Sequence, residues 1–507
     1  MMTGRLPIRL GLAGSGPLGG VFRSDAVGCL PANETTVADA LGAAGYAPRA
    51  AVGKWHLGQR KDCLPTNRGF TDYFGVPYSD DMGPTPWNGG SETHGLPGTP
   101  PLPLIQNTTV IEQPTDLSVL TSKYVSYVTD FLEGRAADAA KAKANGNAAT
   151  PWLMYMAFNH VHTPSFCAPA RCNTTRRGRF GDALAELDDA VGAIVGKLDA
   201  LGLGEDTIVF FTSDNGPWLI RKLEGGSAGA LREGKTTTWE GGVREPGIVR
   251  WTGHLAGAPG RTSREVVATY DIFPTVLALA GAPLPDGVTL DGRDMAPVLF
   301  SDARGTSPHA CVFSWKGVRG VVDPALHGGA YGVVHDGPAG DRARAQLAGD
   351  TRVVDGLWAA RCGAYKAHYV TNTHLNATPV VHAPPLLYNV EMDVGESYPI
   401  DSTSDEYSGA LATITAAVAA HKASIKPVPN QMGMGTDPKY RACCDDTPPS
   451  KYGCTCNPEN WQKKPYTGGD IDYSTPKELP GLPVFRDGFF DPYCDKADEG
   501  AHGSGGR

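Results

Sequence analysis

The stretch Thr207-Ile-Val-Phe-Phe-Thr-Ser-Asp-Asn-Gly-Pro217 carries the clearest structural signal of this 507-residue chain, a buried strand that runs into a polar loop. Its first part, Thr207–Thr212, is β-branched or aromatic throughout, which is typical of a strand covered on both faces. Before it, apolar residues recur at three- and four-residue steps, at Leu184, Leu187, Val191, Ile194, Leu198 and Leu201. This spacing predicts an amphipathic helix that ends at Gly202.

The same alternation of helix and strand extends over the first part of the chain. Thr36-Val-Ala-Asp39 has the pattern of a capping box, which predicts a short helix to about Tyr46 and then a strand at Arg49–Gly53. The apolar run Trp152–Phe158 predicts another strand. We therefore expect an α/β fold with a largely parallel central sheet and helices on both faces, in which ligand sites lie at the carboxyl ends of the strands.

From about residue 304 the pattern changes to shorter strands and turns. Strands are predicted at Ala310–Trp315, Val318–Val322, Ala364–Thr371 and Pro385–Val390, and a helix follows with Leu411, Ile414, Val418 and Ile425 on one face. We interpret the chain as an α/β catalytic domain over residues 1–303, a smaller α+β C-terminal domain over 304–426, and a cysteine-rich, partly flexible tail over 427–507.

Composition and charge exclude two classes of protein. The chain has a net charge of −9 and no run rich in Lys or Arg, so we expect no binding to nucleic acid. No apolar run approaches the roughly 18 residues of a membrane span, so we expect none. The length suffices for two or three cores, and the oligomeric state stays open.

Cysteines and glycosylation sequons indicate the secretory route. The chain has 11 cysteines, and Asn-x-Ser/Thr sequons begin at Asn33, Asn107, Asn173 and Asn376. The set Cys443, Cys444, Cys454 and Cys456 lacks Cys-x-x-Cys spacing, so it fits two disulfides better than a zinc site. The glycine-rich segment Met1–Phe22 lacks the apolar core of a signal peptide, and we expect that the front of a secreted protein is missing.

Four polar clusters follow the predicted strands. They are Gly53-Lys54-Trp55-His56-Leu57-Gly58 with Ser79-Asp80-Asp81 downstream, Asn159-His160-Val-His162-Thr-Pro164, Ser213-Asp214-Asn215-Gly216-Pro217, and Arg232-Glu-Gly-Lys235-Thr-Thr-Thr-Trp-Glu240-Gly-Gly-Val-Arg244-Glu-Pro246. Asp214 and Asn215 offer hard oxygen ligands, which suit Ca²⁺ or Mg²⁺. Lysines and histidines supply positive charge and proton transfer, so the set suits an anionic tetrahedral group such as sulfate or phosphate.

At these motifs the sequence resembles the sulfatase family, within the alkaline-phosphatase-like hydrolases, and its arylsulfatase members in particular. Gly-Lys-Trp-His-Leu-Gly, His-x-His-x-Pro, Asp-Asn-Gly-Pro and Gly-Lys-x-Thr-x-x-Glu-Gly-Gly-x-Arg-Glu-Pro occur in the family's order. The resemblance implies hydrolysis of a sulfate ester of an aryl compound, a glycan or a glycolipid. It also implies that the tail cysteines pair as Cys443–Cys454 and Cys444–Cys456.

The resemblance implies roles for the cationic and metal-binding residues. Asp214 and Asn215 would be two of four ligands to a calcium ion, with Mg²⁺ as the alternative. Lys54 and Lys235 would contact sulfate oxygens and offset the charge that develops on them. Ser79 would donate a hydrogen bond to the sulfate.

The resemblance also implies proton-transfer roles and a nucleophile. His162 would protonate the leaving alcohol or phenol, and His56 would orient the nucleophile and take its proton. The family's nucleophile is a formylglycine, which a formylglycine-generating enzyme makes from the cysteine of a Cys-x-Pro-Ser-Arg motif. That motif lies just before a segment like Met2-Thr3-Gly4-Arg5, so nucleophile and two metal-binding aspartates would precede Met1, and we expect the 507-residue chain to be inactive.

One alternative nucleophile and two alternative functions stay open. Cys167-Ala-Pro-Ala-Arg171 matches Cys-x-Pro-x-Arg, but it follows the His162 motif, and Cys172 offers a disulfide partner. A phosphatase or phosphonate hydrolase of the same superfamily would carry Thr or unmodified Ser at the nucleophile position. A pseudoenzyme would bind sulfated glycans without turnover.

Several polar residues also have a purely structural interpretation. Trp55 is expected in the core and His160 in a supporting position. Asp80 and Asp81 are expected to form a solvated pair, and Glu240, Arg244 and Glu245 a buried ion network. The acidic residues of the helix that ends at Gly202 are expected on its solvated face, at Asp182, Glu186, Asp188 and Asp189.

Overall fold

The computed structural model describes residues 1–13, 20–83, 99–255, 260–301, 305–316, 356–443 and 462–463. Its main sheet has six strands in the order β12-β4-β3-β2-β1-β5. These strands are β1 (Arg49–Gly53), β2 (Asp72–Gly75), β3 (Leu104–Gln106), β4 (Thr109–Glu112), β5 (Leu153–Ala157) and β12 (Gln462–Lys463). The central strand β1 pairs in parallel with β2 and with β5, whereas β3 runs antiparallel to both of its neighbours.

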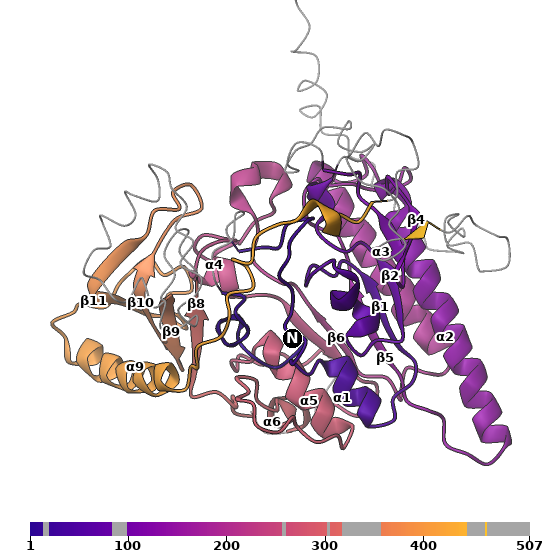
Figure 1. The fold of residues 1–507 in the computed structure, drawn as a ribbon. Coiled ribbons are helices and arrows are strands. Elements are labelled where there is room, and N and C mark those ends of the chain that lie inside the picture. The colour runs from indigo at the N-terminus through magenta and orange to yellow at the C-terminus, as the bar shows by residue number, and fades with distance from the viewer. Residues whose placement is uncertain are drawn as a thin grey trace, which may run out of the picture.

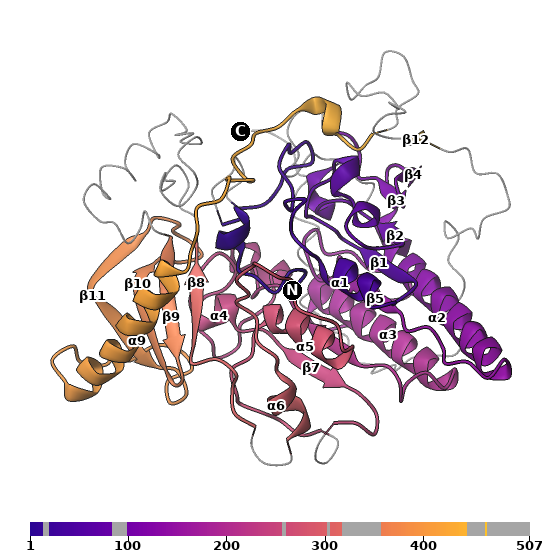
Figure 2. The same ribbon diagram turned by 60° about the horizontal axis from the view of Figure 1, so that its bottom comes forward.

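Helices lie on both sides of this sheet (Figures 1 and 2). The helices α2 (Leu120–Ala144) and α3 (Gly178–Ala200) pack against each other on one side, and α1 (Val37–Ala43) and α5 (Ile272–Leu279) contact each other on the other. Thr36 and Asp39 form both hydrogen bonds of the predicted capping box at the start of α1. The predicted α/β fold with a largely parallel centre is therefore confirmed. The strand β3 adds antiparallel pairing beyond β2.

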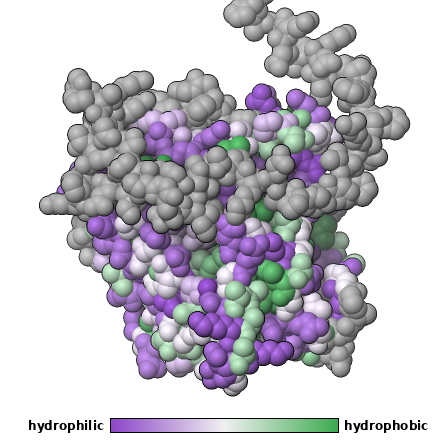
Figure 3. All heavy atoms as spheres, turned by 90° about the vertical axis from the view of Figure 1, so that its right-hand side faces the viewer, coloured by the Kyte–Doolittle hydropathy of each residue, from purple (hydrophilic) through white to green (hydrophobic). Residues whose placement is uncertain are grey.

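The core lies between these layers. Ala50, Ala51 and Val52 of β1 are almost fully buried, and Trp55 joins the same cluster, as the structural interpretation predicted. The outer face of the molecule that carries α2 is mostly hydrophilic, with small apolar groups (Figure 3). Of the described helices, none is long and apolar enough to cross a membrane.

Strand β5 ends the main sheet, and β6 (Val209–Thr212) lies outside it in a two-stranded antiparallel ladder with β7 (Gly247–Arg250). Within the described ranges no strand pairs with the second edge of β5. Every residue of β5 and β6 is partly exposed, although both strands are apolar. A strand inside a parallel sheet would be covered, so these strands lie at open edges.

A second sheet follows, with four antiparallel strands in the order β11-β10-β9-β8. They are β8 (Cys311–Trp315), β9 (Leu357–Cys362), β10 (Tyr365–Thr371) and β11 (Val380–Asn389), and α9 (Asp405–Ala423) packs against three of them. The short helices α4 (Glu240–Val243) and α6 (Ala296–Phe300) precede this sheet in the chain. The predicted strand Val318–Val322 lies outside the described residues.

Three disulfides join described cysteines: Cys29–Cys63, Cys167–Cys172 and Cys311–Cys362. The last one links β8 to β9 at a pair of directly opposed residues. Cys443 is also disulfide-bonded. The two pairings that the resemblance implied for the tail involve Cys444, Cys454 and Cys456, which lie outside the described residues.

Candidate active site

The predicted site residues stand at the carboxyl ends of neighbouring strands. Lys54 and His56 follow β1, Ser79 follows β2, His162 follows β5, Asp214 and Asn215 follow β6, and Lys235 precedes α4. Because β1, β2 and β5 are parallel, their carboxyl ends meet at one edge of the sheet. The fold therefore brings distant parts of the sequence together at that edge.

Side chains from three strands make direct contact there. Lys54 Nζ donates a hydrogen bond to Ser79 Oγ at 3.3 Å, and Ser79 Oγ lies 3.5 Å from His162 Nδ1. Trp218 lies close both to His162 and to Lys235 of the fourth cluster. Its ring centroid is 5.9 Å from that of His162 and 5.3 Å from Lys235 Nζ. Lys54, Ser79, His162 and Lys235 thus surround one small region.

Neither lysine of this region forms an ion pair with a described carboxylate. Among the described residues, no carboxylate lies within 4.0 Å of the Nζ atom of Lys54 or Lys235. Burial lowers the pKa of Lys235, and the charge of Lys54 lowers it further, whereas Asp214 acts in the opposite direction. Asp81 and Asp80 also act against this decrease, but only from beyond ion-pair distance, so two partly buried ammonium groups remain available to an anion.

The two histidines are neutral in this field. Burial and the charge of Lys54 lower the pKa of His56 to about 3 and that of His162 to about 4. His162 Nδ1 lies 2.7 Å from the carbonyl oxygen of Thr163, so Nδ1 carries the hydrogen and Nε2 is left to exchange a proton. His56 Nε2 donates in the same way to the carbonyl oxygen of Phe22, at 2.9 Å.

Asp80 and Asp81 are buried, so the prediction of a solvated pair was wrong. Asn159 Nδ2 donates to Asp80 Oδ1 at 3.2 Å, and Tyr124 in turn donates to the Asn159 side chain at 2.9 Å. Burial raises the pKa of Asp80 to about 7, which the positive charge of Lys54 opposes. Asp80 also lies 3.8 Å from His162, so the sequence interpretation missed an acidic group directly behind the site.

The described residues fit a calcium ion only in part. Asp214 is exposed at the end of β6, and Asn215 Nδ2 donates to the carbonyl oxygen of Gly216, which leaves Asn215 Oδ1 available as a ligand. Nearby, burial and the charge of Asp214 raise the pKa of Glu245 to about 7. In the part of the chain that the structure describes, no group of three or more His, Cys, Asp or Glu residues could hold a metal ion.

Cys167 is bonded to Cys172 and nearly fully buried, so its sulfur is not a free thiol. The segment after it is held by the helix α3. Glu186 accepts a hydrogen bond from the backbone N–H of Ala168, and Asp182 accepts three from residues 173–175. Both carboxylates are buried, and the prediction that they lie on a solvated helix face was wrong.

His160 occupies a supporting place, in line with its structural interpretation. Its ring is buried, with its centroid 4.2 Å from that of Phe166, and its Nε2 lies 3.6 Å from Glu186. Glu240 belongs to a buried ion network, as predicted, because it lies 2.9 Å from Lys366 and 3.2 Å from Arg361. Its other predicted neighbour, Arg244, is half exposed and 4.0 Å away.

Known proteins are similar to this chain in both sequence and fold. The family described as Sulfatase matches residues 1–282, and the C-terminal region of aryl-sulfatase matches residues 348–456. The chain is 36% identical to arylsulfatase A of Homo sapiens over 486 residues, which is 90% of this chain and 83% of that protein. It is 33% identical to arylsulfatase G of Mus musculus, with the same coverage of both chains.

A solved structure supports the fold. The PsFucS1 sulfatase from Pseudoalteromonas sp. superposes with a TM-score of 0.64 at 24% identity, over 85% of this chain and 80% of that one. The first matched segment contains β1 to β7, and the second contains β9, β10 and β11 of the four-stranded sheet.

Proposed function

The chain belongs to the sulfatase family, the enzymes that hydrolyse sulfate esters, and from this premise we propose that Lys54, Ser79, His162 and Lys235 bind the sulfate group of the ester. One observation carries the proposal. Lys54 at the end of β1 and Lys235 before α4 each lie more than 4.0 Å from every described carboxylate, so an anion bound beside them would offset their charge. A sulfate group has the charge and the acceptor oxygens for this place.

His162 would be the general acid. Its pKa of about 4 is too low for an acid at neutral pH, because burial and the two lysines oppose a further positive charge. A bound sulfate would offset the positive charge of the two lysines and would therefore raise the pKa of His162. The proton then sits on Nε2, since Nδ1 already donates to Thr163. His56, neutral and with Nε2 engaged by Phe22, would accept a proton at Nδ1.

Asp214 and Asn215 would supply two ligands to a calcium ion, with magnesium as the alternative. When bound, the ion would add positive charge beside the sulfate. The described residues offer only this half of a ligand set, so the sulfate-binding role above depends on the two lysines, Ser79 and His162.

The nucleophile would come from outside these 507 residues. No Cys-x-Pro-Ser-Arg motif occurs in the sequence, and Cys167 of the partial motif is in a disulfide. We therefore infer that this chain binds sulfate without turnover, and that a form carrying the motif would need a formylglycine-generating enzyme as partner.

We base the proposed substrate classes and the proposed location of this chain on its similarity to the arylsulfatases. Sulfated aryl compounds, glycans and glycolipids are the proposed substrate classes, and a lysosomal or extracellular place is the proposed location. Exposed sequons support passage through the secretory route, because glycosylation needs accessible asparagines. All four of them are exposed: Asn33, Asn107, Asn173 and Asn376.

Calorimetric titration with inorganic sulfate tests the proposal. Lys54→Ala and Lys235→Ala should each weaken binding about tenfold or more, since each removes one charge-assisted contact. Lys197→Ala is the matched control, because this exposed lysine already pairs with Glu133 at 2.7 Å and should leave the affinity unchanged. Equal affinity of all three variants and the wild type would refute the sulfate site.

Hydrolysis of p-nitrophenyl sulfate tests the inference that this chain binds sulfate without turnover. No turnover is expected from the 507-residue chain, with or without calcium. Turnover together with formylglycine at Cys167 in the mass spectrum would overturn the inference about the nucleophile.

A further inference from the structure

The loop that carries Lys235 runs from Arg232 to Glu240. Its ends are brought together where the backbone N–H of Gly241 donates to the carbonyl oxygen of Arg232 at 2.8 Å. Within it, Glu233 and Thr236 have left-handed backbone angles, with φ of 61° and 77°. Residues other than glycine rarely adopt this conformation, so contacts from elsewhere must hold the loop in place.

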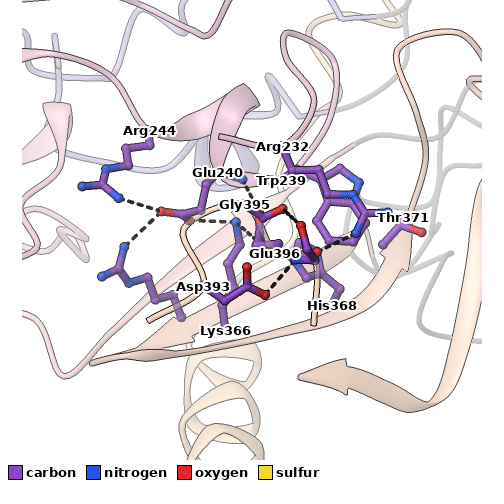
Figure 4. Close-up of polar contacts among 12 residues, drawn as sticks. Arg232, Trp239, Glu240, Arg244, Lys366, His368, Thr371, Asp393, Gly395 and Glu396 are labelled. Atoms are coloured by element: carbon purple, nitrogen blue, oxygen red, sulfur yellow. Dashed lines mark hydrogen bonds and ion pairs between the residues drawn. The ribbon is translucent and has the colours of Figure 1, made fainter. Parts of the chain in front are cut away.

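Glu396 contacts both ends of this loop (Figure 4). Its Oε2 accepts a hydrogen bond from the backbone N–H of Glu240 at 2.6 Å, and its carbonyl oxygen accepts one from Arg232 Nη1 at 2.6 Å. Glu396 follows β11 in the chain, more than 150 residues from the loop, and it is fully buried. One residue next to the second sheet thus bridges the two ends of the Lys235 loop.

Two side chains of β10 hold Glu396 in turn. His368 Nε2 donates to Glu396 Oε1 at 2.6 Å, and Lys366 Nζ lies 3.4 Å from the same oxygen and 2.9 Å from Glu240 Oε1. Burial lowers the pKa of His368 to about 4, so this contact is a hydrogen bond from a neutral ring. The hydrogen bond from His368 and the charge of Lys366 lower the pKa of Glu396 and keep it ionised, although burial alone would raise it.

The middle of the loop is held from the same side. The backbone N–H of His374 donates to Glu233 Oε2 at 2.8 Å. The carbonyl oxygen of Thr236 accepts hydrogen bonds from Lys316 Nζ and from Asn372 Nδ2, the latter at 3.3 Å. All of these groups lie in or beside the second sheet, so its side chains set the conformation of the loop.

We propose that Glu396 is a positioning residue for Lys235: by bridging Arg232 and Glu240 it holds the loop in the conformation that presents the ammonium group to sulfate. This inference rests on the proposed role of Lys235 as a sulfate contact. It assigns a function in the site to the second sheet, although none of its described residues forms a hydrogen bond or ion pair with Lys54, Ser79, His162 or Lys235.

Sulfate titration of a double-mutant cycle tests the proposal. Glu396→Ala should weaken the binding of inorganic sulfate about tenfold, as Lys235→Ala does, because both changes remove the same contact. The double variant should bind no more weakly than Lys235→Ala alone. Additive losses in the double variant, or full affinity of Glu396→Ala, would overturn the proposal.

Asp182→Ala is the matched control. Asp182 is also a fully buried carboxylate that accepts backbone hydrogen bonds, from residues 173–175, but the segment that it holds carries none of the sulfate-binding residues. We expect a comparable fall in melting temperature and unchanged sulfate affinity. A similar loss of affinity in this variant would mean that general destabilisation explains the effect.

Hydrogen exchange separates this inference from the proposed function. In Glu396→Ala the backbone amides of residues 232–241 should exchange faster, whatever ligand the site binds. If Lys235→Ala leaves the sulfate affinity unchanged, the proposed sulfate contact of Lys235 is wrong. If Glu396→Ala leaves the hydrogen exchange of residues 232–241 unchanged, Glu396 does not hold the loop. If Glu396→Ala does not fold, Arg232→Ala removes the second contact without unpairing a buried carboxylate, and the same outcomes apply.

Discussion

Two lysines of this protein lie in opposite surroundings. Lys366 is fully buried between two carboxylates, 2.9 Å from Glu240 and 3.4 Å from Glu396. Lys235 is half-buried beside the ring of Trp218, and none of the described carboxylates comes within 4.0 Å of its Nζ. Removal of a cation that lies between buried carboxylates leaves those carboxylates unpaired and destabilises the fold, whereas a lysine without an ion-pair partner marks a place for a ligand.

The difference predicts opposite effects of removing each charge. The largest effect is expected for Lys366→Met, which leaves Glu240 and Glu396 without their shared cation. Loss of one partner from a buried ion pair costs about 3 to 5 kcal/mol, so urea unfolding should show a decrease in this range. A variant as stable as the wild type would show that the network contributes no net stability.

Acid should weaken the same network through His368. The imidazole packs on Trp239 and Tyr388 and faces Glu396, Lys366 and Glu240, and its pKa falls from 6.5 in the unfolded chain to about 4. The unfolded state therefore binds more protons between these values, and stability contributed by the neutral ring is lost as the pH falls from 6.5 toward 4.

His368→Gln tests this pH dependence, because glutamine keeps a donor for Glu396 but does not titrate. Between pH 7 and pH 4.5 the variant should lose about 2 to 3 kcal/mol less than the wild type. Urea unfolding at both values measures the difference. Parallel losses in the two proteins would contradict a neutral buried imidazole.

Lys235→Met is expected to act on binding and not on folding. Sulfate affinity should fall about tenfold to a hundredfold, while the free energy of unfolding stays the same or rises slightly, because a partly desolvated charge is removed. Titration and urea unfolding of one preparation give both values. A large loss of stability would show that Lys235 is structural.

The smallest effect is expected for Arg244→Ala. Arg244 is half exposed and 4.0 Å from Glu240, and exposed pairs of this spacing contribute only about 0.5 kcal/mol or less. A loss of several kcal/mol would mean that the network extends to the surface.

Local patterns made the sheet and its helices predictable. The strand Arg49–Gly53 is observed as predicted, and the strand and helix around Leu184–Thr212 correspond to α3 and β6. The helix α2 was missed because the stretch after Ala136 is Ala-rich and polar and shows no apolar periodicity, although the first half of the helix packs in the core. The domain boundaries at residues 303 and 426 stay predictions.

The site was predictable where short motifs follow strands, and not where contacts are long-range. Lys54, Ser79 and His162 meet as the parallel strand ends require. Asp182 and Glu186 look solvated on a helical pattern, because their backbone partners belong to a loop whose path the sequence does not reveal. Glu396 lies in no motif, and only the fold places it against Glu240.

The most direct test is a crystal structure of the protein grown with selenate, a sulfate analogue whose selenium gives an anomalous signal. We predict one strong anomalous peak within hydrogen-bonding distance of Lys54 Nζ, Ser79 Oγ and Lys235 Nζ, with His162 beside it. The absence of this peak at saturating selenate would contradict the proposed sulfate site. An ion pair between either lysine and a carboxylate would contradict it as well.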